Sequence, residues 1–349
     1  MSNPNILDQP KYKMNCIIRD GYSGDLINLD SHIESVTWQT YRLASQPSSL
    51  EIVVKEGLRP SDVIINAGSF IRWGVNGQDY FYGNVEMVEL LNSAQDGVIY
   101  RIKAYCHRKL LKYIMSRYRP KGMTGSDFFA QVMTAFNNQI QTMGDVGIRW
   151  AVREPSTAPL DDYYFAVSTL YSMFKDTIGA AHVAERGASQ YMIRDNLGTL
   201  EWRELKALRT NYILGDGSFT DSYTYTSSIE NSANIIKVYR DNPEIGKRDT
   251  WTKFNSGNVR RWRPRQMVLE AQEYMTDVEI SDMIDLYLEA HDRPHRALNM
   301  SCVGINGLQA GDGVQARALR ARIDHHIWCE EASHVYNSDS HMMDLKLYL

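Results

Sequence analysis

The sequence has no long hydrophobic run. No stretch within its 349 residues approaches the roughly 20 consecutive apolar residues that a helix needs to cross a bilayer. The first segment, Met1 to Lys13, is polar and lacks the apolar core of a secretory signal. We therefore expect a protein without a membrane span, made in a cytosol and kept there unless a larger assembly carries it out.

Cysteine is scarce, and none of it is arranged in close pairs. The four cysteines form no Cys-x-x-Cys motif and lie far apart, at Cys16, Cys106, Cys302 and Cys329. This distribution predicts free thiols in a reducing compartment and argues against a zinc site.

Motifs of common enzymes are also absent. The chain has no Gly-x-Ser-x-Gly nucleophile motif, no phosphate-binding loop and no dinucleotide fingerprint. Two histidine pairs are the obvious metal candidates, His325-His326 and His291 with His295. Neither spacing implies a third ligand, and Pro294 interrupts the second pair, so solvated or hydrogen-bonded histidines are the favoured interpretation.

One acidic pair, Asp161-Asp162, is a candidate for hydrolytic chemistry. Adjacent carboxylates at the start of a helix more often cap it and complement its dipole. Hydrolysis of a glycoside also needs two carboxylates placed across the substrate, which sequence neighbours do not supply. We therefore predict no catalytic residue, no cofactor and no metal, and a protein that is not an enzyme.

The composition is that of a folded protein of two or three domains, with 43% hydrophobic and 23% charged residues in 40.0 kDa. The formal net charge of −4 argues against a strongly basic nucleic-acid binder. The 21 tyrosines and 7 tryptophans favour strands and interfaces, so they indicate a β-rich protein that meets partners.

Charge is nevertheless clustered along the chain. Eight Lys or Arg and no acid occur in 101–121, seven occur in 247–265 with only Asp249 opposing them, and eight acids without a cation occur in 270–292. These clusters suit solvated faces, complementary patches between proteins, or a nucleic-acid contact with an interleaved Trp262. The candidate protein-interface residues are Arg260, Arg261, Trp262, Arg263 and Arg265.

The first third of the chain has the pattern of β-strands. Short β-branched and aromatic runs predict strands over 33–38 and 49–55. Residues 68–75 and 78–90 predict a hairpin across Asn76-Gly77, since a type I′ turn needs positive φ at both central residues. Alternation over 98–106 predicts a half-buried strand.

The middle of the chain changes to helical spacing. Ser126-Asp127 is a candidate cap for a helix to about Met143, and a second helix is predicted from Asp161 to about Ala184. Strands return at 189–193 and 199–202 around a turn at 195–198.

The last third returns to strands around one helix. A further β stretch is predicted over 223–240, followed by a basic loop over 242–265. Thr276 is a plausible N-cap for a helix to about Ala290. The final strand is predicted over Met342 to Leu349.

These patterns predict an α+β, mainly β chain rather than a doubly wound sheet, because strands and helices do not alternate regularly. We expect a first β-module over 1–118, completed by about 188–225, a helical insert over 119–187, and a second β-module over 226–349 with its helix at about 276–290.

Four stretches carry a resemblance to a known family. They are VTWQTYRLASQPSSLEIVV (36–54), GSFIRWGVNGQDYFYGNVEMVE (68–89), SIENSANIIKVYRDN (228–242), and the C-terminal run formed by 304–314 and ASHVYNSDSHMMDLKL (332–347). In order and over nearly the whole chain, the sequence resembles the XkdQ/YqbQ-type baseplate hub proteins of contractile prophage tails and tail-like bacteriocins. The family has no catalytic residues, so none is carried over.

The resemblance implies two β-barrel modules related to the tail tube, in a structural subunit of a trimeric ring. Such a ring adapts a six-fold tube to a three-fold spike and lines the central channel. The implied partners are two further copies, the spike protein, the tail tube or its initiator, and baseplate wedge proteins, with DNA or a tape-measure protein passing through. The implied location is the baseplate of a tail particle assembled in the bacterial cytoplasm.

Two alternatives from other classes stay open. A tail-associated peptidoglycan hydrolase requires a converging acid pair or a metal site, and the sequence motifs indicate neither. A carbohydrate-binding β-module acts as a monomer that presents aromatic side chains in a cleft.

Overall fold

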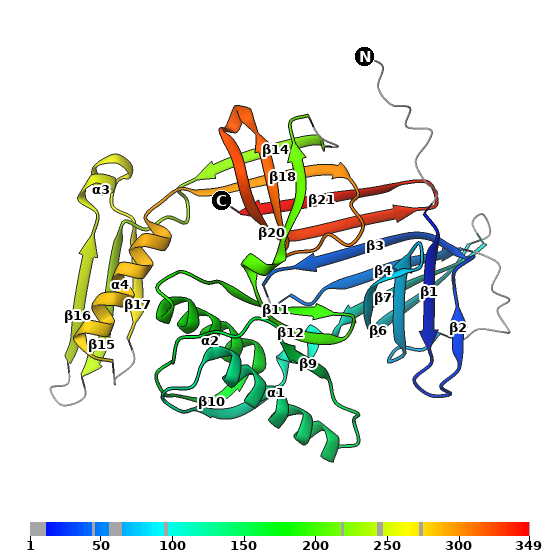
Figure 1. The fold of residues 1–349 in the computed structure, drawn as a ribbon, viewed down its shortest axis with the longest axis horizontal. Helices are drawn as coiled ribbons and strands as arrows, with labels where there is room; N and C mark the ends of the chain where they lie inside the picture. Colours follow the sequence, from blue (N-terminus) through cyan, green and yellow to red (C-terminus); the bar gives the residue numbers. More distant parts are fainter. Residues whose placement is uncertain are drawn as a thin grey trace. The chain divides into compact units, whose positions relative to one another are not determined.

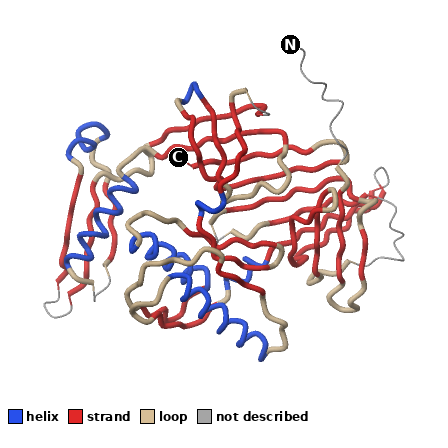
Figure 2. The backbone as a smooth tube through the Cα atoms, viewed as in Figure 1, coloured by secondary structure: helices blue, strands red, loops and turns tan. Residues whose placement is uncertain are grey.

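A computed structural model describes residues 12–43, 46–55, 65–93, 97–217, 220–242, 247–271 and 275–348. The chain divides into two compact units: the first unit comprises residues 1–223 and 299–347, and the second unit comprises residues 224–298 and 348–349. Most elements are strands, which confirms the mainly β prediction (Figure 1 and Figure 2). No helix among the described residues is long and apolar enough to cross a membrane.

A 13-stranded sheet dominates the described part of the chain. Its strands are β1 (Met14–Arg19), β2 (Leu26–Asn28), β3 (Ile33–Tyr41), β4 (Ser49–Lys55), β5 (Phe70–Val75), β6 (Gln78–Ser93), β7 (Gly97–Cys106), β13 (Arg209–Gly215), β14 (Thr220–Ser228), β18 (His295–Val303), β19 (Gly313–Ala318), β20 (Ile323–Asn337) and β21 (His341–Tyr348). Neighbours follow the order β14-β18-β21-β20-β3-β4-β7-β6-β5-β1-β2, and β13 and β19 branch from β20. The pairings form an open path, so closure into two β-barrels stays a prediction.

The predicted hairpins form in this sheet. Asn76 and Gly77, with φ of 53° and 80°, connect β5 to β6, as a type I′ turn requires. The antiparallel pairing of β20 with β3, from Glu331↔Tyr41 to Asn337↔Ser35, then joins the C-terminal strands to the N-terminal ones.

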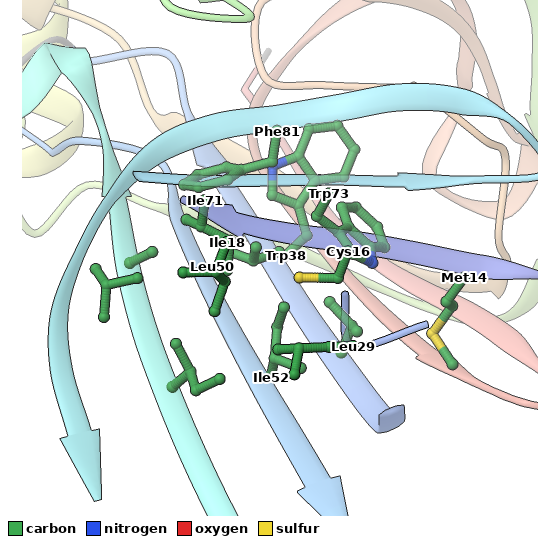
Figure 3. Packing of buried hydrophobic residues seen from close by; sticks show 14 of the residues in the cluster. Met14, Cys16, Ile18, Leu29, Trp38, Leu50, Ile52, Ile71, Trp73 and Phe81 are labelled. Atoms are coloured by element: carbon green, nitrogen blue, oxygen red, sulfur yellow. The ribbon is translucent and has the colours of Figure 1, made fainter. Parts of the chain in front are cut away.

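The core of the N-terminal strands is rich in large aromatic side chains. Trp38 and Trp73 are fully buried, and their ring centroids lie 6.0 Å apart. Figure 3 shows aliphatic side chains from β1 and β4, such as Ile18 and Leu50, packed around them. Tyr336 of β20 belongs to the same cluster, so the core crosses the junction between the two ends of the chain.

Residues 107–208, which we call the middle segment, carry the first two helices. Its elements are η2 (His107–Lys112), β8 (Ile114–Arg119), α1 (Gly125–Thr142), β9 (Arg149–Val152), β10 (Tyr163–Thr169), α2 (Leu170–Ala184), β11 (Tyr191–Asn196), β12 (Thr199–Glu204) and η3 (Leu205–Leu208). They enclose their own core around Phe128, Phe174 and Trp202. A short η4 (Leu319–Ala321) lies in the C-terminal part.

Two details of the helix prediction were wrong. Thr124, rather than Ser126-Asp127, caps α1, because its hydroxyl accepts from the N–H of Asp127 while Ser126 bonds to Ser156. Helix α2 begins only at Leu170. The preceding YYFAVST run pairs with β8 as β10, which agrees with the strand preference of aromatic and β-branched residues.

The second unit is a three-stranded sheet with helices. Its elements are β15 (Ile235–Asn242), β16 (Lys247–Phe254), α3 (Ser256–Trp262), β17 (Gln266–Glu270) and α4 (Asp277–His291), and the strand order is β16-β15-β17. Ile280 and Ile284 of α4 are buried in one cluster with Ile236 and Val238 of β15.

The N-terminal cap of α4 agrees with the prediction. Thr276 and Glu279 form a capping box in which each side chain accepts from the other residue's backbone N–H.

Two other predictions for this part of the chain, the loop over 242–265 and the single β region over 223–240, were wrong. The predicted loop over 242–265 contains β16 and α3, because charged β16 residues pair across the sheet, as Arg248 does with Asp241. The stretch 223–240 was predicted as one β region but supplies β14 and β15, which lie in different sheets. The predicted modules at 1–118, 119–187 and 226–349 were delimited by sequence pattern, whereas the two units are defined by compactness. The module boundaries therefore stay a prediction.

Two glycines give opposite predictions for stability. A Cβ on Gly83 of β6 would lie 2.2 Å from the carbonyl oxygen of Tyr105, whereas a Cβ on Gly179 of α2 would meet nothing within 4 Å. We expect Gly83→Ala to lower the unfolding free energy by about 1–3 kcal/mol through overpacking. Gly179→Ala should raise it by up to about 1 kcal/mol through helix propensity. Denaturant unfolding of both variants measures the change in unfolding free energy. Equal changes would contradict the close contact at Gly83 and the open space at Gly179.

Candidate interaction surfaces

One face of the large sheet is polar across several strands. Apolar side chains of β3, β4, β7, β20 and β21 point into the core, and the alternate residues point away from it. We call the second set the polar face: Ser35, Thr37, Gln39, Tyr41, Ser49, Glu51, Val53, Arg101, Lys103, Tyr105, Glu331, Ser333, Val335, Met342, Asp344 and Lys346. The strands that carry it are paired without a break at the junction between β20 and β3, which lie side by side in Figure 1.

Several charges on the polar face are matched by a neighbouring strand. Lys346 Nζ lies 2.9 Å from Glu331 Oε1, and Arg101 Nη1 lies 3.5 Å from Glu89 Oε2 of β6. Glu51 lies directly opposite Lys103 in the ladder between β4 and β7. Apart from Val53, Val335 and Met342, the face is therefore hydrophilic, without a dominant charge sign, and such exposed pairs contribute little to stability.

Two histidines lie on the core side of the same junction. Nδ1 of His334 lies 2.9 Å from Nε2 of His341, and Nε2 of His334 lies 2.7 Å from the carbonyl oxygen of Leu308. Both are fully buried, and the His334 ring stacks on Trp38 with centroids 5.1 Å apart. Desolvation lowers the pKa of His334 to about 4 and, with the nearby His334, that of His341 to about 3. Both rings are thus neutral at neutral pH.

A buried arginine attaches the middle segment to the sheet. The Arg108 guanidinium donates to the carbonyl oxygens of Tyr41 and Leu43 at the end of β3. Desolvation lowers its pKa. The N–H of the preceding His107 donates to Asp195 of β11 at 2.9 Å, so η2 is fixed to β3 on one side and to β11 on the other.

The cluster at 101–121 therefore does not form one basic surface. Arg108 and Arg119 are buried, and Arg119 donates to the carbonyl oxygen of Asp161. Lys109 pairs with Glu86 at 2.6 Å.

The predicted interface residues lie at and just after α3. Arg260, Arg261 and Arg263 are exposed, and among the described residues none of them has an ion-pair partner. We call these three residues the basic tip. Trp262 and Arg265 are only partly exposed, and Arg265 donates to the carbonyl oxygen of Glu230 at 3.4 Å.

A buried asparagine holds the segment that follows α3. The side-chain amide of Asn234 donates to the carbonyl oxygen of Arg263 at 2.9 Å, and its oxygen accepts from the N–H of Arg265 at 2.9 Å. At the start of α3, Asn255 and Asn258 donate to the carboxylate of Asp292. No local sequence pattern predicts these contacts, because the partners are up to 37 residues apart.

The acidic cluster has partners within its own unit. Asp285 of α4 pairs with Lys253 of β16 at 2.6 Å, and Asp277 lies 3.7 Å from Arg240 of β15. Part of the charge complementarity expected between proteins thus stabilises the second unit itself.

The histidine and aspartate pairs considered as metal or catalytic candidates do not converge on one site. His325 and His326 are exposed on β20, while the ring centroids of His291 and His295 lie 6.1 Å apart. Among the described residues, no group of three or more potential ligands converges on a metal position. Asp161 and Asp162 are exposed before β10 rather than at a helix start.

All four cysteines are buried free thiols. Desolvation raises their pKa, that of Cys106 to about 12.

Comparison with known proteins finds a matching family and similar folds over most of the chain. The sequence matches the family described as YQBQ-like over residues 36–348. The fold is similar to a tail protein from Neisseria meningitidis MC58, with a TM-score of 0.69 at 12% identity over 96% of each chain. It is also similar to the 43 kDa tail protein of prophage MuSo2 from Shewanella oneidensis, with a TM-score of 0.66 at 11% identity over 95% of this chain and 98% of that one.

A prophage tail protein from Listeria monocytogenes EGD-e gives a TM-score of 0.60 at 14% identity over 96% of this chain and 94% of that one. No curated protein matches the sequence significantly. At these identities the structural likeness shows the fold.

Replacing Arg108 should destabilise the first unit. In Arg108→Met the carbonyls of Tyr41 and Leu43 lose their donor, which costs about 1–3 kcal/mol for each group left unpaired. The control, Arg101→Met, removes an exposed pair and should cost less than about 1 kcal/mol. Denaturant unfolding compares them, and similar losses would refute the anchoring role.

The histidine pair predicts acid sensitivity. The unfolded chain gains protons below the ordinary histidine pKa of 6.5, whereas native His334 and His341 stay neutral down to about pH 4 and 3. Unfolding free energy should therefore be highest above pH 6.5 and decline as the pH falls towards 4. Denaturation at pH 7.5, 6, 5 and 4 measures this. His341→Phe should decline less steeply, exposed His325→Gln should follow the wild type, and equal stability at pH 7.5 and 5 would contradict the prediction.

Proposed function

The chain belongs to the YQBQ-like family, and we propose that it is the structural baseplate hub of a contractile tail. The likeness to tail proteins over nearly the whole chain supports a role as a structural component of a tail. The hub role, the trimeric ring and the channel are the finer parts of the proposal. In this role the protein performs no catalysis.

The observation that carries the proposal is the continuous sheet. Pairing of β20 with β3 joins strands from both ends of the chain into one surface whose polar face is hydrophilic. A channel wall needs such a face, because a passing DNA or tape-measure protein must not adhere to apolar side chains. Three chains would each contribute an N-terminal and a C-terminal half of the sheet, which gives six comparable segments below a six-fold tube.

The ends of the sheet support assembly into a ring. Among the described strands the path ends at β2 and β14, which leaves strand edges for pairing with neighbouring copies. A closed ring requires such heterologous contacts, in which one copy offers a different surface from the one it receives. The spike, the tail tube or its initiator and baseplate wedge proteins are the proposed further partners, and the tail particle is the proposed location.

The mass of the purified chain in solution, alone and with the spike protein encoded beside it, tests the proposal. We expect a particle of three 40.0 kDa chains, alone or once the spike is added. Image averages of that particle should show three-fold symmetry with six similar segments. A strict monomer that ignores the spike, or turnover of purified peptidoglycan, would overturn the hub role. Monomeric binding of a glycan would favour the carbohydrate-binding alternative.

A further inference from the structure

The basic tip of the second unit has no ion-pair partner in the part of the chain that the structure describes. Arg260, Arg261 and Arg263 are exposed, and among the described residues none lies in an ion pair. Three other cations of this unit, Arg240, Arg248 and Lys253, pair with carboxylates.

The backbone that presents the basic tip is firmly held. Fully buried Asn234 bonds to the backbone on both sides of Pro264 through its amide and its oxygen. Asp292 receives hydrogen bonds from Asn255 and Asn258 at the other end of α3. A fixed backbone reduces the entropy lost when these side chains bind, as preorganised interfaces require.

Helix α4 carries the opposite charge on its solvent side. Val278, Asp282, Asp285 and Glu289 follow at helical spacing and are exposed. Asp285 pairs with Lys253, but Asp282 and Glu289 have no ion-pair partner among the described residues. We call Asp282 and Glu289 the acidic face. Although both patches lie on one compact unit, they do not pair with each other within one chain.

We infer that the basic tip of one copy docks on the acidic face of α4 in a neighbouring copy. A contact between different patches on two identical chains is heterologous, which is the type a ring needs. The inference rests on the proposed ring and adds a second contact to the pairing of its sheets. Because exposed ion pairs are individually weak, the contact chiefly directs the orientation and rate of assembly.

A nucleic acid fits the basic tip less well. A long phosphate backbone that reached these arginines would also meet the carboxylates of nearby α4, since Asp292 is bonded directly to α3. A second copy instead supplies a short acidic patch. Asp282 and Glu289 are seven positions apart, which corresponds to two helical turns or about 10 Å.

Charge exchange between the two patches tests the contact. Arg260→Glu with Arg261→Glu, or Asp282→Lys with Glu289→Lys, should each weaken association of the full-length chain about 10-fold. Combining all four substitutions in one chain should restore it to within about 3-fold. Sedimentation velocity at low and high salt measures association, with the spike present if the ring needs it.

A matched control reverses two exposed cations of the first unit, Lys175→Glu with Arg320→Glu, and should associate like the wild type. Unchanged thermal unfolding shows that each variant is folded. If the wild type forms trimers and neither reversal matters, or if the combined variant gains nothing, this contact is discarded while the hub proposal stands. If the wild type never associates, even with the spike, both the hub proposal and this contact are refuted. If the tip reversal abolishes binding of a DNA duplex but leaves association intact, the tip serves nucleic acid instead.

Discussion

The pairing of β20 with β3 is the contact on which the rest of the first unit depends. It connects strands that are nearly 300 positions apart in the chain, and it places Tyr336 against the tryptophans of the N-terminal core. Without it the polar face would be two separate surfaces and the aromatic core would lose one side. The proposed channel wall is therefore a property of the joined sheet, not of either half.

Buried polar groups make this junction specific. His334 is satisfied only when Leu308 and His341 are both in register, and Arg108 is satisfied only when the end of β3 meets η2. A one-residue slip of β20 would bury Glu331 and Ser333 and expose His334, which costs far more than sliding a uniform apolar ladder. These residues select one register from the many that a plain hydrophobic sheet permits.

Some features that depend on a few neighbouring residues, such as one turn and one helix cap, were predicted correctly from the sequence. The Asn76-Gly77 turn and the Thr276 cap follow from φ preferences and from hydrogen bonds that span three residues, so the sequence was sufficient for both. Strand β10 and strand β16 were missed because aromatic or charged residues obscure the period of two, and their pairing partners decide the structure. The candidate Arg cluster was found from charge alone. Asn234, which fixes it, was not, because its contacts come from distant segments.

The long sequence separation of β20 and β3 also determines the order in which the molecule is completed. During synthesis, β1 to β7 leave the ribosome long before their C-terminal partners, so the edge of β3 stays open while about 280 further residues are added. A sheet of such high contact order closes slowly, and its open edge can pair with another nascent chain. Pairing of the C-terminal hairpin with β3 thus completes the sheet. A chain truncated before this hairpin would expose the unpaired edge of β3 to aggregation.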